Sequence, residues 1–266
     1  MQELLRRGFS GFLYVFILLF CELYSQETFL ALFAFFLIVS VYEFTRLVKI
    51  LYIPSIIIGT IFYIFFNKYA LQDIYWEVIT WFSAIICIYG ILFLFSEKSH
   101  MSVLIKSLFL VGYVIIPFVL LSKIPMGIKG YNPKILIGIF VLTWTQDTFA
   151  FIVGKTIGKH KLLERISPKK TIEGFIGGCL FTFGASLFIA KYFTEASLYI
   201  WGGIAIIICV FGTLGDLFES KLKRIANVKD SGSIMPGHGG ILDRLDSIIF
   251  AAPFLYLFFI ILRYVS

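Results

Sequence analysis

Long runs of apolar residues follow one another along the whole chain, separated by short polar segments. A helix needs about 20 residues to cross the hydrocarbon core of a bilayer. Because a backbone inside a bilayer must satisfy its own hydrogen bonds, such runs are expected to be helical. We predict nine membrane-spanning helices, at about residues 9–24, 29–45, 50–66, 75–95, 104–121, 135–153, 172–190, 198–218 and 247–265.

The composition is far more apolar than that of a soluble protein. Hydrophobic residues make up 59% of the 266 residues, and the mean hydropathy is +0.94. Soluble globular domains are only about half apolar. The chain is therefore predicted to be an all-α, polytopic membrane protein in which no separate soluble domain is left over.

Positive charge falls mostly on one side of the predicted bundle. The chain has 23 Lys and Arg residues against 16 Asp and Glu residues, for a net charge of +7. Most of the basic residues share a side with the N-terminus, above all in segments 154–171 and 219–246. Because Lys and Arg concentrate in cytoplasmic loops, we predict a cytoplasmic N-terminus. Such loops can simply bind anionic headgroups, but two loops this basic suggest a more specific anion.

The polar residues divide the chain into two regions. Residues 1–122 form an N-terminal helical region with little information about a site, and residues 123–266 form a C-terminal helical region that carries the polar motifs. In the first region Glu43 is followed at i+3 by Arg46. This spacing is most simply interpreted as an ion pair at a helix end.

The first candidate site residue is Asp147, which lies inside the apolar run predicted at 135–153. An ionised carboxylate in the bilayer core costs several kcal/mol, so such residues usually face a partner or an aqueous cavity. Asp147 is therefore a candidate for a functional site. The structural alternative is a buried hydrogen bond that holds two helices together.

A basic motif, "ISPKKTIEG", precedes the helix predicted at 172–190. Ser167 followed by Pro168 predicts a helix N-cap with proline in the first turn. Lys169, Lys170 and the free backbone N–H groups would then converge at the positive end of the helix, which suits a phosphate. Taken alone, the same pattern is also an ordinary basic flank of a membrane helix.

The stretch "TLGDLFESKLKR" places acids, a hydroxyl and bases on one helical stripe. Asp216, Glu219, Ser220, Lys223 and Arg224 lie at i, i+3, i+4, i+7 and i+8. A surface helix stabilised by ion pairs accounts for Glu219 and Lys223. It does not account for Asp216, which lies within the apolar end of the predicted span.

The glycine-rich stretch "SGSIMPGHGGILDRLDS", at 231–247, bends the chain back toward that stripe. It ends with Asp243 and Asp246 one helical turn apart, beside Arg244. Facing Asp216, these two carboxylates can present hard oxygen ligands to Mg²⁺. Alternatively, each is an acid that favours a helix N-terminus.

These motifs together resemble the CDP-diacylglycerol synthases, also called phosphatidate cytidylyltransferases. The segment 220–246 contains that family's S-x-x-K-R, K-D, P-G-H-G-G and D-R-x-D elements in order and at the family's spacing. "SPKKTIEG", at 167–174, and Asp147 with Phe149 and Ala150 resemble a second region of the family. The resemblance is dense over the C-terminal half; the N-terminal half is similar only as a stack of helices.

The resemblance implies transfer of a cytidylyl group from CTP to phosphatidate, giving CDP-diacylglycerol and diphosphate for phospholipid biosynthesis. It also implies a multi-span enzyme that depends on Mg²⁺ with K⁺ beside it, and a homodimer. We expect a bacterial plasma (inner) membrane protein whose site faces the cytoplasm, where CTP meets membrane lipid, and we expect no nucleic-acid partner.

Roles for the polar residues follow as hypotheses. Metal ligands are predicted at Asp216 and Asp243. Catalytic candidates are Asp246, which completes the metal site or orients the attacking phosphate, and Lys223, Arg224, Lys229, Arg244 and His238. Substrate-binding candidates are Asp147, Ser167, Lys169, Lys170, Ser220, Gly237, Gly239 and Gly240. For His238, a bond to phosphate and a role in holding the loop both stay open.

Two other functions are compatible with these motifs. A CTP-dependent polyprenol kinase, or a related CTP-using enzyme acting on another lipid, would need similar basic loops and carboxylates. A transporter also places acids within helices and interrupts helices with glycine. However, the charged residues here gather at the predicted inner surface and not at the bilayer midplane.

Overall fold

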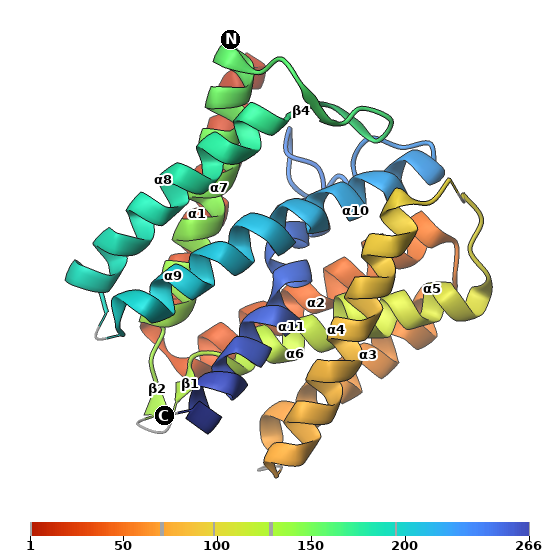
Figure 1. Ribbon diagram of the computed structural model, residues 1–266. Coiled ribbons are helices and arrows are strands. Elements are labelled where there is room, and N and C mark those ends of the chain that lie inside the picture. The colour runs from red at the N-terminus through yellow and green to blue at the C-terminus, as the bar shows by residue number, and fades with distance from the viewer. Residues whose placement is uncertain (1, 70–71, 98, 128–129, 195, 266) are drawn as a thin grey trace.

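Helices form most of the described chain (Figure 1). The computed structural model describes residues 2–69, 72–97, 99–127, 130–194 and 196–265, with side chains described within 8–263. The α-helices are α1 (Gln2–Tyr24), α2 (Gln26–Val48), α3 (Tyr52–Lys68), α4 (Asp73–Phe95), α5 (Val103–Phe109), α6 (Ile116–Lys123), α7 (Lys134–Ile157), α8 (Ile172–Tyr192), α9 (Leu198–Ile207), α10 (Thr213–Ile225) and α11 (Leu242–Val265). The π-helical stretches η1 (Leu110–Ile115) and η2 (Ile208–Gly212) join α5 to α6 and α9 to α10.

Two short antiparallel strand pairs connect helices. Strand β1 (Met126–Gly127) pairs with β2 (Gly130–Tyr131) before α7. Strand β3 (Lys161–Leu163) pairs with β4 (Ser167–Thr171) between α7 and α8.

The prediction of an all-α, polytopic membrane protein is confirmed. In the described part of the chain, 7 helical stretches are long and apolar enough to cross a membrane. Two shorter apolar helices, Gly8–Tyr24 and Tyr52–Lys68, coincide with the first and third predicted spans. The count of nine crossings and the side on which the N-terminus lies stay predictions.

Helix α11 lies in the core of the bundle, where it packs against α2, α4, α6, α10 and η2. Its residues Leu242, Leu245, Ile249 and Phe250 are fully buried. The Phe250 ring lies 5.8 Å from the ring of Phe218 on α10, measured between centroids. The packing of α11 therefore fixes where its polar first turn lies relative to α10.

The polar loops of the C-terminal half gather at one end of the bundle. Figure 1 shows the β3–β4 hairpin and the loop between α10 and α11 at this end, with the β1–β2 hairpin and the C-terminus at the opposite end. Segments 154–171 and 219–246 are thus neighbours in space. Both of the basic segments singled out in the sequence can therefore contribute to one site.

The predicted helix N-cap at Ser167 is wrong. Ser167 lies in β4, where it pairs with Leu163, and Thr171 at the other end of the strand pairs with Lys161. Because this pairing keeps 167–171 extended, α8 begins only at Ile172. The cap is Thr171, whose Oγ1 accepts a hydrogen bond from Gly174 N at 3.1 Å.

Helices α7 and α8 form a closely packed pair whose contact depends on small residues. At Gly177 of α8, an added Cβ would lie 2.6 Å from Cγ1 of Val153 on α7. Farther along α8, a Cβ added at Gly184 would meet nothing within 4 Å. The two glycines therefore offer a matched test of this packing.

We predict that Gly177→Ile destabilises the protein, whereas Gly184→Ile changes its stability little. Overpacking of a close contact typically costs about 1–3 kcal/mol, and the backbone of α7 would have to move to relieve it. The apparent melting temperature of each variant in detergent measures the difference. Equal melting temperatures for the two variants would contradict the proposed packing.

Candidate active site

The first part of the site is the polar stripe on α10. Asp216 Oδ1 accepts a hydrogen bond from Ser220 Oγ at 3.2 Å, one turn along the helix. One further turn on, Lys223 forms an ion pair with the buried Glu219. The predicted continuous helical stripe is confirmed, and the acidic side chains on it are held by neighbours on the same face.

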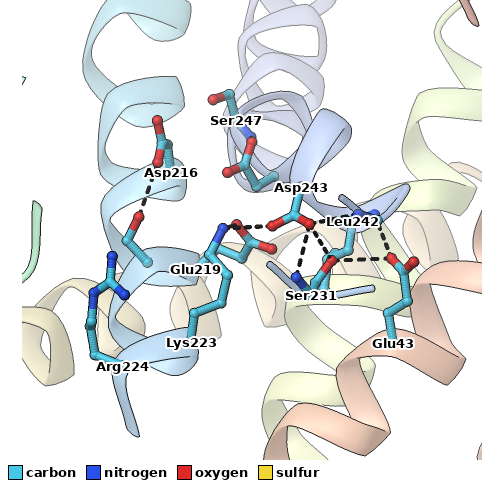
Figure 2. A network of polar contacts seen from close by, with 12 residues as sticks. Glu43, Asp216, Glu219, Lys223, Arg224, Ser231, Leu242, Asp243 and Ser247 are labelled. Atoms are coloured by element: carbon cyan, nitrogen blue, oxygen red, sulfur yellow. Dashed lines mark hydrogen bonds and ion pairs between the residues drawn. The ribbon is translucent and has the colours of Figure 1, made fainter. Parts of the chain in front are cut away.

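Asp243, on the first turn of α11, holds both the loop and α10 (Figure 2). Its Oδ1 accepts a hydrogen bond from Lys223 Nζ at 2.6 Å. Its Oδ2 accepts bonds from Ser231 N at 2.8 Å, Ser231 Oγ at 2.9 Å and Gly240 N at 2.7 Å. A carboxylate with four such contacts and a side chain only 4% exposed is already saturated with donors.

The glycines of this loop allow the chain to pass close to Asp243. Gly239 has φ of +88°, a conformation that favours glycine. A Cβ on Gly239 would also lie 2.6 Å from Asp243 Oδ2. The tight return that was expected from the glycine-rich sequence therefore depends on glycine for both backbone conformation and space.

Asp246 lies one turn farther along α11 and is also buried. Its Oδ1 accepts a hydrogen bond from Ser247 N at 2.7 Å. Both Asp246 and Asp216 line the same cavity, as does Asp147 from α7. The helices α7, α10 and α11 thus each bring at least one carboxylate to a common space, and α11 also brings Asp243.

Lys170 of the β3–β4 hairpin carries a positive charge into this space. It forms an ion pair with Asp216. Burial by itself would lower the pKa of Lys170, but the Asp216 carboxylate, with smaller contributions from Asp147 and Asp246, outweighs burial and raises the pKa. Lys170 is therefore positively charged at neutral pH.

These side chains surround a cavity of about 890 Å³. Its polar wall includes the carboxylates above, Lys170, Lys223 and Arg244. Its apolar wall includes Val15 of α1, Trp144 and Phe151 of α7, and Phe175 of α8. A second pocket of about 590 Å³ adjoins it at the loop between α10 and α11, and the two share His238 and Arg244. The site thus combines charged and apolar lining residues.

Helix α1 closes the cavity beside His238. Ser10 Oγ donates a hydrogen bond to the Pro236 carbonyl at 3.0 Å and lies 2.7 Å from His238 Nδ1. Gly11 packs next to the imidazole, since a Cβ there would lie 3.3 Å from its Cε1. These contacts favour the loop-holding role for His238, and its contact with phosphate stays a prediction.

Comparison with known proteins agrees with this architecture. A profile described as the cytidylyltransferase family matches residues 5–262. The chain belongs to the cytidylyltransferase family. A segment of 118 residues is 51% identical to the phosphatidate cytidylyltransferases of Staphylococcus aureus and Staphylococcus haemolyticus, and 50% identical to that of Staphylococcus epidermidis. This segment covers 44% of the chain and 45% of each relative, so it spans less than half of their length.

In this member of the cytidylyltransferase family, most of the predicted site residues come together. Those that line the main cavity are Asp147, Lys169, Lys170, Asp216, Lys223, His238, Asp243, Arg244 and Asp246. Lys229, Gly237 and Gly239 line the adjoining pocket. The chain segments that supply them are the ones that the motifs singled out.

Four predicted residues lie behind the cavity wall or at its edge. Ser220 supports Asp216, and Gly240 N donates to Asp243. Ser167 lies in β4, and the Arg224 Nε donates to the Ile166 carbonyl at 3.4 Å. Their contacts connect α10 and the loops to the residues that face the cavity, and contact with substrate stays a prediction for each.

The N-terminal half contributes a residue whose role the sequence did not indicate. The predicted ion pair between Glu43 and Arg46 is wrong: Glu43 accepts hydrogen bonds from Ile241 N and Leu242 N, and Arg46 lies against the ring of Tyr42. The i+3 spacing favoured a local partner. Nothing in the sequence pointed to donors almost 200 residues away, and the only available signal was an acid within an apolar run.

We predict that Asp243→Asn loosens the loop between α10 and α11. Hydrogen bonds to a charged group contribute about 1.5–3 kcal/mol each, and an amide cannot accept from both Lys223 and the three loop donors. Local opening should rise more than tenfold, and trypsin should cleave after the exposed Lys229 correspondingly faster. Glu164→Gln, which removes an exposed acid between β3 and β4, away from the cleaved bond, is the control. An unchanged cleavage rate in Asp243→Asn would show that the loop does not depend on this carboxylate.

Proposed function

We propose that this protein is a phosphatidate cytidylyltransferase, which converts CTP and phosphatidate to CDP-diacylglycerol and diphosphate. The observation that carries the proposal is a single cavity lined both by carboxylates and lysines and by apolar side chains. Such a cavity can accept a nucleoside triphosphate and a lipid phosphate together. The names of the staphylococcal relatives support the same activity.

The basic side chains of the cavity suit two anionic substrates. Lys170 approaches from the hairpin, Lys223 from α10 and Arg244 from α11. Since both reactants carry negative phosphates, the main demand on the site is neutralisation of charge and alignment of the two groups. Cations on three different elements can contact several phosphates at once, and an arginine can bind two phosphate oxygens side by side.

The carboxylates fit a Mg²⁺ ion of the kind that phosphate enzymes use. Among the described residues, no group of three or more His, Cys, Asp or Glu side chains is arranged to hold a metal. Mg²⁺ commonly takes one or two carboxylates and completes its shell with water and substrate phosphates. Asp216 and Asp246 fit that donor set better than Asp243, whose two oxygens already receive four hydrogen bonds. When bound, Mg²⁺ would neutralise negative charge on the triphosphate.

The protein residues then have defined roles in the reaction. An oxygen of the phosphatidate phosphate attacks the α-phosphorus of CTP, forming a new P–O–P bond as the bond to the β-phosphate breaks and diphosphate leaves. The attacking phosphate is already ionised at neutral pH, so the step needs no general base. Lys170, Lys223 and Arg244 would hold the phosphates in line and stabilise the departing charge.

The apolar face of the cavity would receive the lipid. Phe151 lines the cavity and is also 66% exposed on the surface of the bundle. The cavity wall therefore reaches the outer surface of α7, a helix long and apolar enough to cross a membrane. Acyl chains could remain in the bilayer while the phosphate enters between α1 and α7.

The remaining features of the proposal rest on charge distribution and resemblance. The basic loops at the cavity end favour a cytoplasmic location for that end, where CTP is present, in a bacterial plasma membrane. The K⁺ ion and the homodimer are carried over from the family resemblance and remain predictions.

Labelled CTP tests the proposed reaction against its nearest rival, a CTP-dependent lipid kinase. We expect purified protein with phosphatidate and Mg²⁺ to transfer label from α-labelled CTP into lipid, and γ-label to appear in diphosphate. A chelator should stop the transfer, and added Mg²⁺ should restore it. Lipid labelled only from γ-labelled CTP would replace the proposal with kinase chemistry, and transport of a solute without CTP turnover would replace it with a transporter.

We predict that Asp246→Asn lowers turnover by about 10²–10³-fold, the range typical for removal of one electrostatic contact to a transition state. The substitution keeps the shape of the side chain but removes its charge from the cavity. Asp73→Asn is a control for loss of an acid, since Asp73 pairs with Arg263 at the far end of the chain. Near-normal turnover by Asp246→Asn at saturating Mg²⁺ would exclude Asp246 from the metal site.

A further inference from the structure

A carboxylate from the N-terminal half of the chain holds the start and the end of the loop that borders the cavity, whereas Ser10 of α1 contacts the middle of that loop. Glu43 lies on α2, and its side chain is almost completely buried. Oε1 accepts a hydrogen bond from Ile241 N at 3.2 Å. Oε2 accepts one from Leu242 N at 2.8 Å and lies 3.3 Å from Ser231 Oγ, whose one proton can be donated to either Glu43 or Asp243. These groups all belong to the loop or to the first residue of α11.

The backbone of the loop is shaped to receive this carboxylate. A Cβ added at Gly232 would collide with Glu43 Oε1, and one added at Gly240 would lie 2.5 Å from both carboxylate oxygens. The chain can therefore close around Glu43 only because glycine occupies these two positions. The loop passes on either side of the carboxylate, which fixes its path relative to α2.

Glu43 also belongs to a continuous polar chain that ends at the cavity (Figure 2). Ser231 Oγ faces both Glu43 Oε2 and Asp243 Oδ2. Asp243 in turn binds Lys223, which pairs with Glu219 on α10. Two carboxylates from distant parts of the sequence thus share the donors of one loop, and together they join α2, α11 and α10.

We propose that Glu43 is a positioning residue for the active site. Its carboxylate fixes the path of residues 231–242 and the start of α11, so that Arg244 and Asp246 face the cavity. Glu43 does not line that cavity, so its effect passes through the loop and the first turn of α11. The reaction affected is the one proposed above, and this inference rests on that function.

The chain offers a matched control for burial of an acid. Glu22 on α1 is also completely buried, and within the described part of the chain neither of its carboxylate oxygens has a hydrogen-bond partner. Its backbone carbonyl accepts from Tyr131 near the opposite end of the bundle. Glu22→Gln therefore tests replacement of a buried carboxyl group by an amide without touching the loop.

The decisive experiment compares Glu43→Gln and Glu22→Gln in the purified protein. For Glu43→Gln we expect kcat to fall at least about tenfold and the KM for CTP to rise several-fold, because an amide places an N–H₂ group against backbone N–H donors. The KM for phosphatidate should rise less than the KM for CTP, since α1, α7 and α8 supply the apolar wall. A variant that is merely less folded would show a lower kcat with both KM values unchanged. Glu22→Gln should keep all three constants.

Glu43→Asp supplies a second variant, which also serves if Glu43→Gln does not fold. It keeps the charge but withdraws the carboxylate, so kcat should fall less than in Glu43→Gln and remain below that of the unchanged protein. Wild-type kcat and KM for CTP in either variant would overturn the proposal, as would equal losses in Glu43→Gln and Glu22→Gln.

Trypsin cleavage after Lys229 separates this inference from the proposed function, because it needs no substrate. Cleavage should be faster in Glu43→Gln than in Glu22→Gln. If the unchanged protein does not turn over CTP, the proposed reaction fails, and the cleavage rates still show whether Glu43 positions the loop. Equal cleavage rates would overturn the positioning role whatever the reaction is.

Discussion

Charge at the edge of an apolar bundle is the constraint on which this site depends. A carboxylate removed from water requires a cation or several N–H donors, because an unpaired buried charge is strongly destabilising. Each acid is stabilised in a different way: Asp216 pairs with Lys170, Asp243 with Lys223 and loop donors, and Glu43 with the start of α11. These pairings draw the β3–β4 hairpin, the loop and three helices toward one end of the molecule. The same contacts that stabilise the charges also assemble the cavity.

The first turn of α11 is where these contacts converge. Its backbone N–H groups lie at the positive end of a helix, which favours negative charge. Glu43 binds Leu242 N from one side, and Asp243 lies within the turn and binds Gly240 N and Lys223. The helix is apolar and buried from Ile248 to Ala252, so the turn cannot shift without disturbing the core. The packing of the buried turns of α11 and the polar contacts of its first turn together give the site a fixed geometry.

Hydropathy alone predicted the helices well, because membrane spans are set by a local property, the length of an apolar run. The site was also largely predictable where its residues are close in sequence, as with the stripe from Asp216 to Lys223 on α10. Prediction failed where the partner was distant or where tertiary pairing overrode a local signal. Ser167 was predicted to be a helix cap but pairs with Leu163 in a strand. The backbone donors to Glu43 lie 198 and 199 residues farther along the chain. No spacing rule within one helix can reveal such contacts.

Asp243 and Asp246 illustrate why two acids one turn apart need not share a role. The sequence makes them equivalent, since both precede an apolar helix and flank Arg244. The loop folds back over Asp243, and three of its donors bind Oδ2. Lys223 donates to the other oxygen, Oδ1. Asp246 lines the same cavity as Asp243 and Asp216, but it lies one turn beyond the loop, and its Oδ1 accepts from Ser247 N within α11. The glycines that let the loop fold back therefore give the two acids different surroundings without any change in the helix itself.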